Sequence, residues 1–172
     1  MSLSDVANVV EIIGIFAILF GVVFGLVQLN QSRRQRRELA ILECARSFED
    51  KDFTEAYRLI SRLPAGISVA DFEKLGDQYE AAALRVGMKF ETMGLLVHRG
   101  VVPIDAMSDL VGGAALTIWN VIQPWVEETR IQRLHPTFWE WYQWLVERLL
   151  DRGRADRPPV FLTEKNWKEP NH

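Results

Sequence analysis

The stretch IIGIFAILFGVVFGLV, from Ile12 to Val27, is followed closely by the basic run RRQRR at residues 33–37. Less strictly apolar residues extend the apolar run to residues 6–29, with polar residues only toward its ends. A helix rises about 1.5 Å per residue and the hydrocarbon core of a bilayer is about 30 Å thick, so about 20 mostly apolar residues span it. The segment therefore predicts a single transmembrane helix over residues 6–29.

A cleaved signal peptide is the first alternative to this interpretation. Such a peptide places basic residues before a shorter apolar core and small residues at a cleavage site after it. Here the order is reversed, because the leading residues 1–5, MSLSD, are acidic and the arginines come afterwards. A buried core helix is the remaining alternative.

The arginines after the run predict an orientation, because positive residues that flank a span remain in the cytoplasm. We expect residues 1–5 to face outward and residues 30–172 to lie inside, at the inner (cytoplasmic) membrane of a bacterium. Cys44, the lone cysteine, agrees with a reducing compartment, although a small apolar core residue is the simpler account of it. The residues expected at the membrane surface are Arg33, Arg34, Arg36 and Arg37.

Charge is separated along the chain. The net charge of −3 divides into −2 for residues 1–28, +3 for residues 29–48 and −4 for residues 49–172. Positive charge beside the predicted span suits anionic lipid headgroups. A nucleic-acid-binding domain would carry its basic patch on the folded part instead. The lipid bilayer is thus an expected partner, and nucleic acid is not.

Small residues form a stripe along the predicted span. Their spacing of i, i+3, i+7 and i+11 places them on one helix face, and the last two make a GxxxG pair. Such a face lets two helix backbones approach closely, which predicts self-association or binding to another membrane protein. The alternative is that glycine is common in membrane helices without a packing role. The four residues are Gly14, Ala17, Gly21 and Gly25.

The remainder of the chain repeats its apolar residues at helical spacing, which predicts an all-α fold. We expect a basic juxtamembrane helix over residues 30–50, a cytosolic helical domain over residues 51–153 and an irregular tail over residues 154–172. Within the domain, capping residues, glycines and prolines mark the ends of the helices. The expected helices begin near Asp52, Ser68, Asp77, Ile104 and Pro136, with a kink or break near Pro124.

Two local details accompany these ranges. Asp52 and Glu55 have the spacing of a capping box at a helix start. The apolar face of the helix over residues 77–99 is expected to include Leu84, Met88, Leu95 and Val97.

Residues that carry catalysis or bind metals are not arranged in recognisable motifs. His98, His135 and His172 are isolated, without the HxxxH or ExxH spacing of a metal site. The pair Gly112-Gly113 fits neither phosphate-binding glycine pattern and predicts a close helix crossing instead. The sequence therefore predicts a protein that is not an enzyme and that has neither a metal nor another cofactor.

Aromatic residues cluster near the last predicted helix. Phe138, Trp141, Tyr142 and Leu145 share one helix face, whereas Trp139 lies away from it. The cluster also includes Trp144. Together with Trp119 and Trp125 it would suit a core, a partner surface or contact with the membrane. A charged pair between helices, Arg130 with either Glu140 or Glu91, is expected to be structural.

From about residue 85 to residue 149 the chain resembles the DUF4760 family, a family of unknown function. The resemblance is carried by Phe90-Glu91, Gly94, Arg99-Gly100, Trp119, Pro124, Arg130 and Phe138. It implies a small prokaryotic protein with an N-terminal span, basic residues after it and a helical cytosolic domain, and it implies no activity. The chain departs from the family in its extra tryptophans and its tail. Glu91, Trp119 and Arg130 become the first positions to test.

These observations predict a non-enzymatic, single-pass membrane protein. It would act as an interaction or accessory subunit that associates with itself or with a larger membrane complex, through the small-residue stripe and through aromatic residues such as Trp139, Trp141 and Trp144. The alternative function is a homo-oligomeric pore, in which the glycine-bearing faces of several spans enclose a path near Glu11.

Overall fold

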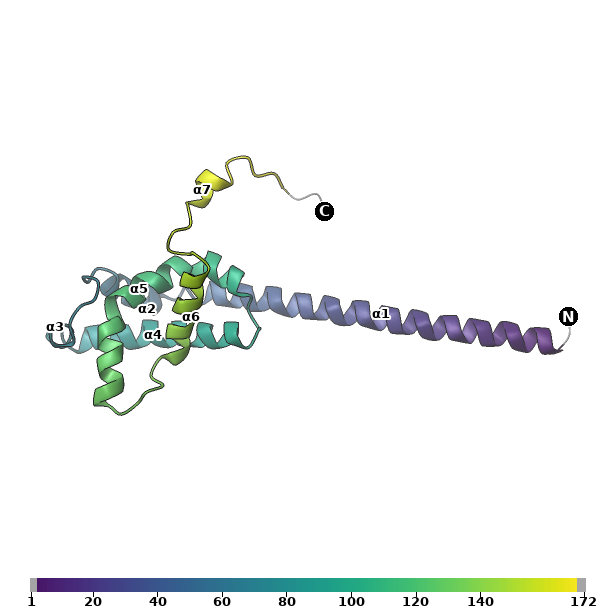
Figure 1. The fold of residues 1–172 in the computed structure, drawn as a ribbon, viewed down its shortest axis with the longest axis horizontal. Helices are drawn as coiled ribbons and strands as arrows, with labels where there is room; N and C mark the ends of the chain where they lie inside the picture. Colours follow the sequence, from purple (N-terminus) through teal and green to yellow (C-terminus); the bar gives the residue numbers. More distant parts are fainter. Residues whose placement is uncertain (1–2, 170–172) are drawn as a thin grey trace. The chain divides into compact units, whose positions relative to one another are not determined.

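A computed structural model describes the backbone of residues 3–169 and the side chains of residues 16 and 18–169. The described residues form helices and no strand, which confirms the all-α prediction. The chain divides into two compact units, Met1–Ala40 and Ile41–His172. The helices, labelled in Figure 1, are α1 (Leu3–Arg46), α2 (Lys51–Ile60), α3 (Val69–Glu73), α4 (Asp77–His98), α5 (Ile104–Gln132), α6 (Glu140–Asp151) and α7 (Val160–Thr163).

The first unit is made by helix α1, whose large apolar side chains between Phe16 and Leu29 are exposed. Within the described part of the chain, no helix meets the length and apolarity required to cross a membrane. The span predicted over residues 6–29 thus finds no support there. Gly14, Ala17 and the outward-facing segment 1–5 lie outside the residues whose side chains are described.

Short helices at the start of the second unit begin at side-chain caps. Asp50 adopts an extended backbone before α2, and its carboxylate accepts a hydrogen bond from the Asp52 N–H at 3.0 Å. The predicted capping box at Asp52 is therefore wrong by two residues, since Asp52 already lies inside the first turn. Ser68 caps α3 by accepting from the Asp71 N–H at 3.2 Å, at the predicted helix start.

Helix α4 is the central helix of the second unit. Its predicted range holds to within one residue, but its predicted apolar face is only partly correct. Val97 is buried as expected, whereas Leu84 and Leu95 are half-buried. Met88 is 65% exposed, whereas Val86 and Phe90 are fully buried. Small residues explain the difference, because Ala82, Ala83 and two glycines extend the buried face to positions that hydropathy alone does not mark.

Glycines on α4 allow α6 to approach closely. A Cβ on Gly87 would lie 2.1 Å from the ring of Trp139, and a Cβ on Gly94 would lie 2.1 Å from the carbonyl oxygen of Trp141. Real Cβ atoms essentially never come this close to another heavy atom. The two absent side chains thus set the distance between these helices.

Helix α5 contains Pro124 and changes direction along its length, as Figure 1 shows. A proline has no N–H, so the carbonyl four residues earlier, at Asn120, loses its helical partner. That carbonyl instead accepts a hydrogen bond from the Gly66 N–H at 2.7 Å. The predicted kink at Pro124 is therefore where the loop after α2 attaches to α5.

The last long helix starts later than predicted. Residues 136–139 form a turn, and α6 begins at Glu140. Trp139 precedes it with φ 54° and ψ 43°, a left-handed conformation that L-residues adopt at a cost. This backbone directs the Trp139 side chain inward, where it is only 4% exposed, so the expectation that it lies away from the packed face is wrong.

Two ion pairs connect the segment after α6 to the start of α5. Arg152 pairs with Asp105, and Arg157 pairs with Asp109 at 2.6 Å. The predicted tail 154–172 includes one short helix, α7, whose side chains Val160, Phe161 and Leu162 are exposed.

Gly94→Ala tests whether close approach sets this packing. We expect it to lower the free energy of unfolding by about 1–3 kcal/mol, because the added methyl group meets backbone that cannot rotate away. Urea unfolding followed by circular dichroism gives the value. Gly113→Ala is the matched control, since its Cβ would have Arg154 Nη2 at 3.9 Å as nearest neighbour, and it should stabilise by about 0.5–1 kcal/mol. Equal stability of the two variants would refute the packing argument.

Candidate functional site

Glu91, Trp119 and Arg130 all lie around the start of α6, although they come from α4 and α5. Trp119 packs edge-on against the ring of Tyr142, with 4.9 Å between centroids. Phe90 stacks on the same ring, also at 4.9 Å, and the Tyr142 hydroxyl donates to the Ala115 carbonyl at 2.7 Å. Burial raises the pKa of Tyr142 well above its usual value, so the hydroxyl stays protonated and keeps this bond.

Arg130 organises the turn before α6. Its Nε donates to the Phe138 carbonyl at 2.8 Å, its Nη1 to Gln143 Oε1 at 2.6 Å and its Nη2 to the Trp139 carbonyl at 3.3 Å. These bonds hold the left-handed residue and its neighbour in place. The predicted ion pairs with Glu91 or Glu140 are absent among the described residues, because backbone and amide oxygens take the guanidinium donors.

Glu91 caps α6 from a neighbouring helix. Its Oε2 accepts from the Tyr142 N–H at 2.7 Å, and the Trp141 N–H also hydrogen-bonds to this carboxyl. A helix start leaves such N–H groups without partners, and the side chain at the cap position here, that of Trp139, supplies no acceptor. Burial raises the pKa of Glu91, while the hydrogen bonds from these amides oppose the rise.

The aromatic side chains divide between core and surface. Trp139 and Tyr142 are buried, whereas Trp141 and Trp144 are half-buried around His98. The ring centroid of His98 lies 4.4 Å from that of Trp141 and 5.4 Å from that of Trp144. The predicted cluster is therefore two groups, one that holds the fold and one that reaches the surface.

The described residues contain no group of three His, Cys, Asp or Glu side chains placed to hold a metal ion. Burial raises the pKa of the Cys44 thiol, which lowers its thiolate fraction at neutral pH. Glu91 and Arg130 both hydrogen-bond to α6 or to the turn before it. Together with Trp119, they therefore position α6.

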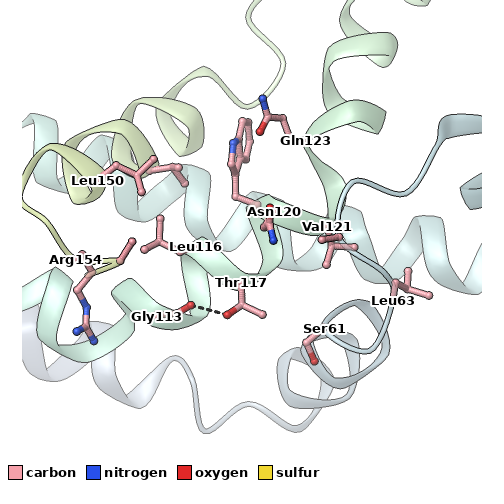
Figure 2. Close-up of a pocket in the computed structure, with 14 residues that line it drawn as sticks. Ser61, Leu63, Gly113, Leu116, Thr117, Asn120, Val121, Gln123, Leu150 and Arg154 are labelled. Atoms are coloured by element: carbon pink, nitrogen blue, oxygen red, sulfur yellow. Dashed lines mark hydrogen bonds between the residues drawn. The ribbon is translucent and has the colours of Figure 1, made fainter. Parts of the chain in front are cut away.

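A groove of about 730 Å³ lies on another side of α5 and was not predicted. Its walls come from the loop after α2, from α5, from α6 and from the turn that follows. Figure 2 shows Arg154 and Leu63 at opposite ends, with Leu116 and Thr117 between them. A groove assembled from four separate segments has no local sequence signal, although the pair Gly112-Gly113 marks one end of it.

Arg154 lies over this glycine pair. A Cβ on Gly112 would come within 2.9 Å of Arg154 Nε, so the glycine makes room for the arginine side chain. The predicted close helix crossing at Gly112-Gly113 is therefore a close contact with a side chain. Among the described residues, the buried Nε atoms of Arg154 and of Arg148 have no hydrogen-bond partner.

Replacement of Glu91 tests the cap. Glu91→Ala should lower the free energy of unfolding by about 1–3 kcal/mol, because part-buried N–H groups of α6 lose their acceptor. Glu140→Ala, which removes an exposed carboxylate from the same helix start, is the control and should change it by less than about 0.5 kcal/mol. An equal effect of the two replacements in urea unfolding would contradict a capping role.

The raised pKa gives the same site a pH dependence. The folded state holds the Glu91 proton more tightly than the unfolded chain does. The free energy of unfolding therefore falls as the pH rises from the pKa of the unfolded chain, about 4.3, through the higher pKa of the folded protein. Relative to Glu91→Gln, which does not titrate, the wild type should lose stability over that interval and then stay level. A difference between the two that grows with pH in favour of the wild type would overturn the sign.

The chain matches one protein family. A family model described as "Domain of unknown function (DUF4760)" matches residues 12–149 of the 172-residue chain. The matched region includes every residue of the α6 start described above, and most of the groove. Neither a curated protein nor a solved structure matches the chain. The chain belongs to the DUF4760 family.

Proposed function

We propose that this protein is a non-enzymatic accessory subunit of the bacterial inner membrane. Residues 6–29 would span the bilayer, and the unit Ile41–His172 would lie on the cytoplasmic side. The observation that carries the proposal is the exposure of large apolar side chains around helix α1, which are 56–74% exposed between Phe16 and Leu29.

The distribution of these side chains favours a lipid environment. Val22, Val23 and Phe24 follow one another at about 100° steps around the helix, and all three are exposed. A helix that is apolar on all sides is typical of a membrane span or of the centre of a large protein. A monomer in water rarely exposes so large a continuous apolar surface.

The basic residues after this segment support the same placement. Arg33, Arg34, Arg36 and Arg37 are all exposed. Of these four, only Arg34 pairs with an acid among the described residues, through Glu38 at 3.1 Å. Unpaired basic side chains near anionic headgroups contribute about 1 kcal/mol each. They would also retain the following unit in the cytoplasm.

Association through the helix is the second part of the proposal. A Cβ built on Gly21 or on Gly25 meets nothing within 4 Å, so this face is open to a second helix. Close backbone contact across small residues stabilises helix pairs in lipid. The subunit would thus bind copies of itself or a membrane partner.

Arginine substitutions within α1 test the anchor. Phe20→Arg combined with Val23→Arg should release the protein from membranes, because each arginine near the centre of a span costs about 2.5–3.5 kcal/mol. The fraction that stays in membranes after an alkaline wash measures the effect. Met88→Arg with Ile131→Arg, two exposed positions of the second unit, should leave that fraction unchanged. Release of the wild-type chain by the wash would refute the anchor.

Leucine substitutions test the small-residue face. Gly21→Leu with Gly25→Leu should reduce the oligomer to a smaller species in native mass spectrometry, because the larger side chains separate the helix backbones. A Cβ at either position has no neighbour within 4 Å. Val23→Leu with Val27→Leu adds bulk on other faces of α1 and serves as the control. The same oligomer in both double variants would exclude this face as the contact.

A further inference from the structure

The groove on α5 has the size and lining of a small-molecule site. Its volume of about 730 Å³ falls within the range of about 300–1,000 Å³ that is usual for such sites. Apolar side chains, including Leu116, Val146 and Leu150, line most of its length. Polar side chains are interspersed along the lining, and such groups orient a ligand in a pocket. They are Ser61, Thr117, Asn120, Gln123 and Arg154.

The charge at one end of the groove indicates the class of ligand. Neighbouring arginines are neutralised within the chain: Arg148 by Asp151, Arg152 by Asp105 and Arg157 by Asp109. Arg154 has no acidic partner among the described residues. Its Nε is buried without an acceptor, as is the Nε of Arg148, so the absence of an acidic partner is what distinguishes Arg154. A guanidinium without an acidic partner is available to a carboxylate or phosphate, which forms strong charge-assisted hydrogen bonds with arginine.

We infer that this groove binds a small organic anion, with an apolar body along Leu116 and Leu150 and a carboxylate or phosphate at Arg154. Gly112 leaves space for the Arg154 side chain, since a Cβ there would come within 2.9 Å of Nε. A Cβ on Gly113 would lie 3.9 Å from Arg154 Nη2, so only a longer side chain at that position would reach the guanidinium. The hydroxyl of Thr117 donates to the Gly113 carbonyl at 2.9 Å, so that oxygen does not compete for the arginine. This site does not depend on the proposed function, because all of its residues lie in the second unit.

Binding of 2-naphthoate, compared with its neutral isostere 2-naphthamide, tests the inference. Isothermal titration of the full-length chain, in the buffer or neutral-lipid nanodisc that keeps it monodisperse, should give saturable binding of the anion. The amide should bind at least about tenfold more weakly, because it cannot form the charge-assisted bonds. A parallel titration with 2-naphthyl phosphate distinguishes a phosphate site from a carboxylate site. No saturable binding of either anion, or equal binding of the amide, overturns the inference.

Variants locate the binding within the groove. Arg154→Gln should weaken naphthoate binding by about tenfold, whereas Arg157→Gln, which removes the same charge three residues away and outside the groove, should change it by less than about twofold. Gly113→Leu should block the Arg154 end while the helix remains folded, since leucine favours a helix more than glycine does. Binding that survives Arg154→Gln, or survives Gly113→Leu in a folded chain, would overturn the assignment.

Discussion

The approach of α6 to α4 is the contact on which the second unit depends. The face of α4 that makes this contact carries Gly87, Glu91 and Gly94 at helical spacings of four and three. The glycines let the ring of Trp139 and the backbone of Trp141 lie against the α4 backbone. The carboxylate between them then accepts the N–H groups that the start of α6 leaves free. One helix thus supplies both the space and the cap for another.

Sequence patterns predicted where the helices lie better than how they pack. Boundaries follow from local chemistry, such as the cap at Ser68 and the left-handed glycine at Gly100, and these are visible in a short window. Packing faces depend on which side chains are absent. Met88 was expected inside because it is large and apolar, but Gly87 and Gly94 take the contacts.

In the candidate site, too, sequence patterns did not predict the contacts. Glu91 and Arg130 stood out in the sequence as charged residues beside apolar faces, but they were paired with charged partners. Apart from the Gln143 side chain, their partners are backbone N–H and C=O groups of the segment 138–142, which no sequence pattern reveals. The left-handed backbone at Trp139 was equally hidden, because tryptophan has no preference for it.

The proline in α5 has an effect beyond the bend. By removing one N–H from the helix it makes the Asn120 carbonyl available, and the Gly66 N–H binds it across the chain. Asn120 also lines the groove, together with Ser61 and Ala65 from the loop that this bond fixes. Hydrogen–deuterium exchange at the single amide of Gly66 therefore reports local opening of the groove floor, separately from global unfolding of α4 and α6.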